Sequence, residues 1–341
     1  MEVVTFYSVL LLPYILTILL IISVVLAFRG KWKMSLTMMA LCFFLNSWAE
    51  VFSIAKPFVG HNASTDLSIM TYNIHAMGNY MDENRESPDG IVDFIVRQQT
   101  DVVALQEYDS VRCQVLQQRL SAEYPFYESM PRFKYMGGNA VFSKFEITSC
   151  KYGILNDSGK DVKVINDTKG VRKVNPERLI VLMELNVKGE KVRLANCHFE
   201  SNNIDERIIL EGDSLKWYQM LPIFHREIVR SISIRKEEAN LLNSWVRKHN
   251  DAPIIICGDL NDFSGSSTLT TLQDNNYTIL KDAWWKGGLG YGATYHGHKF
   301  MHFRLDHILY SNKLRLQKVK VAEQDFSDHD AFVAGFKFVG Q

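Results

Sequence analysis

The sequence contains few cysteines, and none of them are paired at a metal-binding spacing. It has five cysteines in 341 residues, and the motif Cys-x-x-Cys does not occur. An odd number of scattered cysteines indicates neither a disulfide framework nor a zinc site. Cys197 and Cys257 lie in apolar, strand-like runs, so we interpret them as small buried hydrophobic side chains.

An excess of charge of either sign is also absent. Lys and Arg together number 38, and Asp and Glu together number 38. Proteins that bind nucleic acid usually present a basic face, so this balance does not favour a nucleic acid partner, although a local basic patch would be compatible with it. With 47% apolar and 22% charged residues, the chain can bury a core and is not of the disordered type.

One long uncharged run dominates the N-terminus. Residues 3–28 contain no charged side chain, whereas about 20 apolar residues suffice to span a bilayer. A secretory signal peptide begins with basic residues and ends in a cleavage site of small residues. Glu2 is the only charge before Arg29, so the run predicts a retained transmembrane helix.

A second apolar segment, residues 34–55, is long enough to cross again, although Asn46 and Glu50 weaken that expectation. The loop 29–33 between the two segments carries three basic residues, and short basic loops stay in the cytoplasm. Two spans predict an integral membrane protein whose large domain is extracytoplasmic. If the second segment only lies on the surface, the domain is cytoplasmic. The expected organisation is an anchor at 1–56, a linker at 57–65 and one large domain at 66–341.

From Asp66 onward, apolar strands alternate with amphipathic helices. This pattern is typical of an α/β or α+β domain in which two sheets pack together. Lys188 and Gly189 separate two of the strands, as in a hairpin, and residues 226–249 predict one long helix. The runs predicted as strands are 67–74, 101–107, 139–144, 178–187, 191–199, 252–259, 304–311, 316–323 and 331–338, and two further helices are expected within 88–100 and 109–124.

Polar side chains recur where these strands end. Any one of them could satisfy a turn, cap a helix or form an ion pair, but six strand ends with an acid, amide or imidazole indicate a site, because ligands collect at strand ends in such folds. Carboxylates and amides without thiolates suit a hard cation such as Mg²⁺ or Mn²⁺. Cleavage of a phosphate ester needs a metal, a base for water and donors to the phosphoryl oxygens. The residues are Asn73, His75, Glu107, His198, Asp259, Asn261, Asp306, Asp328 and His329.

These residues stand in the motifs TYNIH, QE, CH, GDLN, RLDHIL and SDH, in that order. Over residues 66–339 this order resembles the endonuclease/exonuclease/phosphatase superfamily of DNase I-like enzymes. The resemblance implies a four-layer sandwich of two central β-sheets flanked by helices. It also implies a phosphoesterase site with one or two metals.

The resemblance further implies metal-binding roles. Glu107 corresponds to the main metal ligand, with Asn73 beside it, and Asp328 corresponds to a metal ligand or a supporting acid. His75 stands where several members have an acid, which puts a second metal in doubt. The segment after His329 lacks a proline that often follows in the family.

The catalytic roles follow in the same way. Asp259 corresponds to the residue that orients or deprotonates the attacking water, and Asn261 to its partner on the phosphate. His198 and His329 correspond to donors to the phosphate. A histidine needs an orienting carboxylate to present one tautomer, and Asp306 is the strand-end candidate for His329. The motif RLDHIL departs from inositol polyphosphate 5-phosphatases and argues against such substrates.

Two loops are candidates for substrate contact. Residues 201–225 form an expected insertion with an apolar tip, which would touch lipid or else pack against the core or anchor. Residues 283–300 are rich in glycine and aromatic residues and could stack on bases or sugars. The candidate contact residues are Trp217, Tyr218, Trp284, Trp285, Tyr295 and Arg304.

Three functions stay open. The favoured one is a membrane-anchored phosphodiesterase or phosphatase that acts on a lipid headgroup or another small phosphoester. The second is a membrane-anchored nuclease, and the third is a catalytically silent binding module on the same fold. The third is disfavoured because every expected catalytic position is retained.

Overall fold

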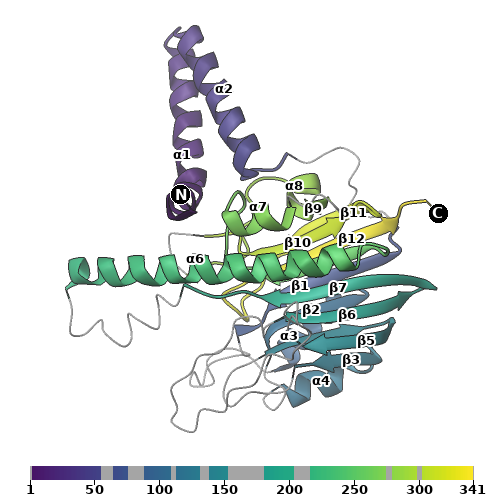
Figure 1. Cartoon of the computed structure of the whole chain (residues 1–341). Helices are drawn as coiled ribbons and strands as arrows, with labels where there is room; N and C mark the ends of the chain where they lie inside the picture. Colours follow the sequence, from purple (N-terminus) through teal and green to yellow (C-terminus); the bar gives the residue numbers. More distant parts are fainter. Residues whose placement is uncertain are drawn as a thin grey trace.

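The computed structural model describes residues 2–54, 64–75, 88–108, 113–130, 138–152, 180–202, 216–273, 279–297 and 302–340. Two six-stranded mixed sheets pack against each other and form the centre of the molecule (Figure 1). The first sheet has the order β11-β12-β1-β2-β4-β3. Its strands are β1 (Leu67–Asn73), β2 (Val102–Tyr108), β3 (Phe126–Ser129), β4 (Gly138–Ser143), β11 (Leu314–Ala322) and β12 (Ala331–Phe338).

The second sheet has the order β5-β6-β7-β8-β10-β9. The expected hairpin joins β6 to β7 in antiparallel register, with Lys188 and Gly189 both at positive φ, as a tight hairpin turn requires. The sequence did not predict the short strands β3 and β9 or the half-exposed strand β5. The strands are β5 (Glu146–Tyr152), β6 (Ile180–Val187), β7 (Glu190–His198), β8 (Ile254–Asp259), β9 (Leu280–Asp282) and β10 (Asp306–Ser311).

Helices cover the outer face of each sheet, so the expected four-layer sandwich is confirmed. One apolar cluster, which includes Ile69, Leu194 and Ile308, fills the space between the sheets. A second apolar cluster lies between the first sheet and its covering helices, and a third lies between the second sheet and its covering helices. The covering helices are α3 (Pro88–Arg97) and α4 (Gln114–Leu120) on one face, and α6 (Trp217–Lys248) and α7 (Ser267–Gln273) on the other. Helix α6 begins nine residues before the expected 226, so the last nine residues of the expected 201–225 insertion are helical.

Two N-terminal helices form a hairpin that projects from the sandwich (Figure 1). They are α1 (Glu2–Phe28) and α2 (Trp32–Ala49), and Ser23 bonds to Ser35 between them. Of the helices in the described part of the chain, α1 alone is long and apolar enough to cross a membrane. Helix α2 ends at Ala49, so the expected second segment, 34–55, is helical only in its first part. The expected linker lies largely outside the described residues.

The hairpin has a buried end and an exposed end. Phe6, Val9 and Leu12 of α1 are buried against the sandwich, together with Val51 after α2. Farther along, the apolar side chains are exposed, as in Ile21, which is 59% exposed. The start of α1 and the segment after α2 therefore both contact the sandwich, and the basic loop lies at the exposed tip.

Candidate active site

The strand ends of the two sheets converge on one cavity of about 320 Å³. The first sheet contributes Asn73 from β1 and Glu107 from β2. The second sheet contributes residues at the ends of β7, β8 and β10, and the loop before β12 closes the group. The acid, amide, imidazole and serine side chains that line the cavity are His75, Glu107, His198, Ser201, Asn202, Asp259, Asn261, Asp328 and His329. The strand-end residues predicted from the sequence are thus brought together, with Asn73 and Asp306 buried directly behind the cavity.

The backbone around the site is held in uncommon conformations. Glu107, Asn261 and His75 have φ angles of 54°, 50° and 44°, in the left-handed region that non-glycine residues rarely adopt. Gly258 precedes Asp259 with φ 138°, and a Cβ there would lie 1.8 Å from the Cys197 carbonyl oxygen. Backbone strain of this kind persists where the surrounding structure fixes functional side chains.

Asn73 links the acids from the two sheets. Its amide nitrogen donates to Glu107 Oε1 and to Asp259 Oδ2, both at 3.1 Å. Its amide oxygen accepts from the His75 backbone N–H at 3.0 Å, which also fixes the orientation of the amide. Because Asn73 is 1% exposed, it sets the spacing of the two carboxylates rather than contacting solvent.

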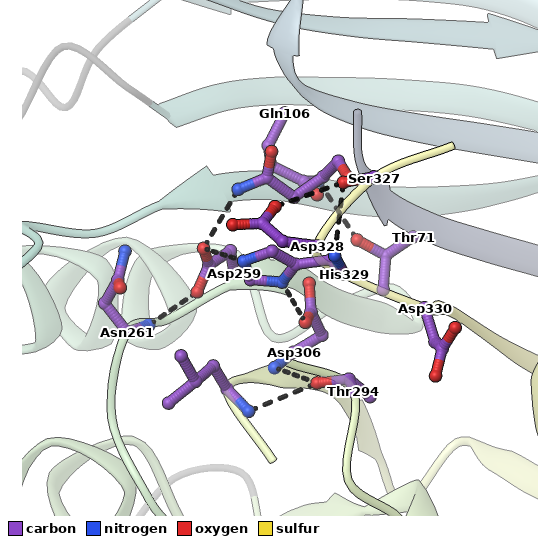
Figure 2. A network of polar contacts seen from close by, with 12 residues as sticks. Thr71, Gln106, Asp259, Asn261, Thr294, Asp306, Ser327, Asp328, His329 and Asp330 are labelled. Carbon is purple, nitrogen blue, oxygen red and sulfur yellow. Dashed lines mark hydrogen bonds and ion pairs between the residues drawn. The ribbon is translucent and has the colours of Figure 1, made fainter. Parts of the chain in front are cut away.

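His329 is held between two acids (Figure 2). Its Nδ1 lies 2.8 Å from Asp306 Oδ2, and its Nε2 lies 3.6 Å from Asp259 Oδ2. Burial alone would lower the pKa of His329, but the charges of Asp306 and Asp259 raise it to about 10. The imidazole is therefore a cation at neutral pH and presents its second N–H toward the cavity side.

Asp259 is almost completely buried at the end of β8. Burial raises its pKa, and the charge of Asp306 adds to the rise, while His329 and His198 oppose it. Its Oδ1 accepts from the Asn261 backbone N–H at 2.9 Å, and its Oδ2 lies 3.7 Å from His198 Nε2. A buried carboxylate with a raised pKa is a stronger base than a carboxylate in water.

Glu107 combines partial exposure with an ionised carboxylate. Burial would raise its pKa, but the attraction of His198 and His75 and the hydrogen bond from Asn73 together lower it. His75 Nδ1 lies 3.9 Å from Glu107 Oε2 and 3.4 Å from Asp328 Oδ1, so these two acids face a common point. Oxygen donors of this kind fit Mg²⁺ or Mn²⁺.

Among the described residues, no group of three or more His, Cys, Asp or Glu side chains is positioned to hold a metal ion. Mg²⁺ keeps several waters and binds proteins through one or two carboxylates, so it does not need such a group. The donor set therefore fits a hard cation and not a structural zinc ion, which needs four protein ligands.

The sequence profile of the Endonuclease/Exonuclease/phosphatase family matches residues 70–329, which include all the cavity residues from the two sheets. The chain belongs to this family. No curated protein sequence matches it.

Several solved structures share the fold of this chain. A humanised D. rerio TDP2 has a TM-score of 0.55 at 15% identity, over 79% of this chain and 98% of the other. An endonuclease/exonuclease/phosphatase from Bacteroides vulgatus has a TM-score of 0.54 at 15% identity, over 80% and 98%. The human Nocturnin catalytic domain with a bound sulfate anion has a TM-score of 0.52 at 17% identity, over 80% and 93%. At these identities the likeness shows the fold alone.

Two of the expected substrate contacts lie in the core instead. Trp284 is 8% exposed, and its indole N–H donates to the Gly290 carbonyl at 3.1 Å. Arg304 is 2% exposed, and its Nη1 donates to both carboxylate oxygens of Asp282, at 2.9 and 3.0 Å. Both side chains were expected to contact substrate from a loop, but their polar groups are bonded within the protein.

The remaining expected contacts divide. Tyr295 lines the cavity, with its ring 4.9 Å from the ring of His329. Trp285 is partly buried and does not line the cavity. Tyr218 is half exposed at the start of α6 and also does not line it, while the side chain of Trp217 lies outside the described residues, as do residues 203–215 of the expected insertion.

A larger cavity of about 850 Å³ lies on the other side of Tyr295, between the 287–296 loop and β11. His296 and Asp330 line this larger cavity, whereas Asn73, Glu107 and Asp259 do not. We place the candidate chemistry in the smaller cavity because the carboxylates and the charged imidazole converge there.

Sequence reasoning missed several residues that support or line the site. Ser327 accepts from the His329 backbone N–H at 3.1 Å and donates to the Asn73 carbonyl at 2.8 Å, which ties the SDH loop to β1. Its place directly before Asp328 in that motif was the available signal. Phe6 and Leu10 of α1 also line the cavity, and no local pattern predicts such a long-range contact.

Proposed function

We propose that the protein is a membrane-anchored, divalent-metal-dependent hydrolase of phosphoric esters, with a lipid headgroup or another small phosphoester as substrate. The observation that carries the proposal is the single cavity in which a charged His329, a buried Asp259 and an ionised Glu107 face one another. Phosphoryl transfer needs the functions that these three groups supply: a donor to the phosphoryl oxygens, a base and a metal ligand.

Glu107 would hold Mg²⁺ or Mn²⁺, with Asp328 and the Asn73 amide beside it. A cation bound there would supply neutralisation of the negative charge on the phosphoryl oxygens. Because Asn73 bonds to both Glu107 and Asp259, it fixes the metal ligand relative to the base. The number of cations stays open, since His75 lies where a second acid would be needed.

Asp259 is assigned the role of base. Its carboxylate orients a water molecule and takes a proton from it as the water attacks phosphorus and the leaving oxygen departs. The raised pKa of Asp259 brings its basicity closer to that required near neutral pH. The backbone N–H of Asn261 holds Oδ1, which leaves Oδ2 toward His329 and His198.

His329 and His198 are assigned the role of donors to the phosphoryl oxygens. Asp306 fixes the His329 tautomer through Nδ1, so that Nε2–H is the proton available to the substrate. An imidazolium donor is charge-assisted and therefore stronger than a neutral one. Asn261 also lines the cavity. Its amide nitrogen donates to the Phe199 carbonyl at 3.0 Å, and this bond fixes the orientation of the amide.

The anchor and its sidedness also belong to the proposal. Helix α1 is apolar enough to cross a membrane, and the far halves of α1 and α2 expose large apolar side chains. Helix α2 is less apolar than α1, but the start of α1 and the segment after α2 both contact the sandwich, which favours a hairpin that crosses twice, with the basic 29–33 loop in the cytoplasm and the catalytic domain on the opposite side.

A nuclease is the second candidate. One solved structure of the same fold is D. rerio TDP2 complexed with a single-strand DNA product. In this chain, the ring of Tyr295 beside His329 could stack on a base. The balanced charge of the chain and the apolar wall of the cavity favour the first candidate.

The test is a hydrolysis assay on the full chain in nonionic detergent with Mg²⁺ or Mn²⁺. The substrates are bis-p-nitrophenyl phosphate, sphingomyelin, phosphatidylinositol phosphates and plasmid DNA. We expect turnover of the nitrophenyl ester and of a lipid, with DNA intact. Nicking of DNA at catalytic protein concentrations would favour the nuclease. Metal binding without any turnover would contradict the proposed hydrolase and favour a silent binding module.

A further inference from the structure

The catalytic cavity has an apolar wall in addition to its polar one. Eight acid, amide and imidazole side chains line one part of it. The other part is lined by Phe6, Leu10, Ile228, Phe263, Phe303 and Leu305. A free phosphate or a sugar phosphate has no use for six apolar side chains within the same space of about 320 Å³, because such a wall binds hydrocarbon.

Two of these residues come from the N-terminal helix. Phe6 is packed against Phe263, with ring centroids 5.3 Å apart, and the Arg235 guanidinium lies 5.6 Å from the Phe6 ring centroid. Leu10 lies one turn farther along the same face and is only partly buried. The anchor helix is therefore a wall of the catalytic cavity as well as a tether.

Polar contacts fix the start of α1 on the catalytic domain. The Tyr7 hydroxyl lies 3.1 Å from His225 Nδ1, with the two rings stacked, and Glu2 forms an ion pair with Lys236. His225 and Lys236 both belong to α6. These directional contacts orient Phe6 and Leu10 toward the cavity, which nonspecific packing of an apolar helix would not do.

The length of α1 sets the depth of this wall in a membrane. A span needs about 20 residues, and about 20 residues counted back from Phe28 reach Val9. Leu10 then lies at the boundary of the hydrocarbon and Phe6 at the level of the headgroups. The catalytic cavity would thus open beside α1 where phosphates and acyl chains of a bilayer meet.

We infer that Phe6 and Leu10 of α1, with the apolar side chains opposite them, form a substrate subsite for the alkyl or acyl part of an amphiphilic phosphoester. This inference rests on the proposed hydrolase function and names its substrate class. The phosphate lies against Glu107, Asp259 and His329, and the hydrocarbon leaves the cavity along α1.

The test compares two diesters that differ only in their chains, ethyl p-nitrophenyl phosphate and decyl p-nitrophenyl phosphate. Both lose p-nitrophenolate when water attacks phosphorus, so the ratio of their kcat/KM values reports contacts with the chain. The full-length protein is assayed at one nonionic detergent concentration with Mn²⁺. We expect the wild type to prefer the decyl ester by at least about tenfold.

The matched variants are Leu10→Asn and Leu11→Asn. These neighbours have the same side chain, but Leu10 lines the cavity and Leu11 is 51% exposed on another face of α1. Leu10→Asn should lower the decyl preference at least about fivefold, while Leu11→Asn and the apolar Leu10→Met should retain it. Turnover of the ethyl ester shows that each variant is folded.

Several outcomes would overturn the subsite. These are an equal preference in Leu10→Asn and Leu11→Asn, an equal loss of both esters in Leu10→Asn, or a higher kcat/KM for an oligonucleotide than for the decyl ester. In each case the wild type would still hydrolyse the ethyl ester, and the proposed hydrolase function would stand. Failure of the wild type on both esters would overturn the hydrolase function and the subsite together.

Discussion

The Nδ1 of His329 lies 2.8 Å from Asp306 Oδ2, while the Nε2 of the same ring lies 3.6 Å from Asp259 Oδ2. One imidazole thus joins an orienting acid to the assigned base. Removal of the orienting charge in Asp306→Asn should lower kcat for bis-p-nitrophenyl phosphate by at least about 100-fold, because the tautomer and the charge of His329 both depend on it. The control is Asp325→Asn, an exposed acid four residues before His329, which should retain activity. Equal kcat values for the two variants would exclude the assigned pair.

The pH dependence of kcat/KM follows from the same two groups. Asp259 must be ionised, and its pKa is raised above the ordinary value, so activity should be lost as pH falls through that raised pKa. His329 must be protonated, and activity should fall as pH rises through about 10. Asp306→Asn should move the alkaline limb to lower pH, since the charge of Asp306 is what raises the pKa of His329. An alkaline limb that is unchanged in this variant would show that another group sets it.

Arg304 and Asp282 form a buried ion pair that supports the site without facing it. Asp282 is buried, yet Arg304 and His307 lower its pKa well below the ordinary range. Loss of Arg304 removes the main cationic partner of a buried carboxylate, so Arg304→Met should lower the free energy of unfolding by about 3–5 kcal/mol. The pair of the partly buried Lys144 with the exposed Glu123 offers the control, and Lys144→Met should lower the free energy of unfolding by less than about 1 kcal/mol.

Chemical denaturation in nonionic detergent measures both variants of this comparison. Because the folded-state pKa of Asp282 is depressed, its stabilisation is present above its unfolded pKa and is lost as pH falls through the folded one. The difference in the free energy of unfolding between wild type and Arg304→Met should therefore become smaller only in strong acid. Similar losses of stability in Arg304→Met and Lys144→Met would contradict this account.

The proposed topology places Gly30 and Asn312 on opposite sides of the membrane. Gly30 lies in the hairpin tip, and Asn312 is exposed at the turn between β10 and β11. In a background with Cys42 and Cys150 replaced by serine, an impermeant maleimide should label Asn312→Cys on intact cells but not Gly30→Cys. The other three cysteines are buried and should stay unlabelled. Labelling of both positions from one side would contradict two spans.

Local patterns predicted most of the fold and the grouping of the site. Alternating and continuous apolar runs predict the long strands, and strand ends with Asn73, Glu107 and Asp259 predict a common edge. Those patterns are local in sequence. Once the strands pair in the two sheets, the residues at their ends lie at the same edge. The short strand β9 has only three residues and carries too little periodicity to be recognised.

The errors concern side chains whose polar groups find partners within the protein. Trp284 and Arg304 suggest a binding loop, but the Gly290 carbonyl accepts from the indole and the buried Asp282 carboxylate pairs with the guanidinium. The contribution of Phe6 to the cavity depends on packing against Phe263, more than 250 residues away in sequence. No spacing rule predicts a contact of that range.

The most direct test of the central claim, a metal-dependent ester hydrolase centred on Glu107, measures Mn²⁺ binding by calorimetry and hydrolysis of bis-p-nitrophenyl phosphate on the same samples. The variant is Glu107→Gln, with Glu128→Gln of the half-buried strand β3 as the control. We predict that Glu107→Gln weakens Mn²⁺ binding and lowers turnover at least about 100-fold, while Glu128→Gln retains both. Wild-type Mn²⁺ affinity and turnover in Glu107→Gln would contradict the account.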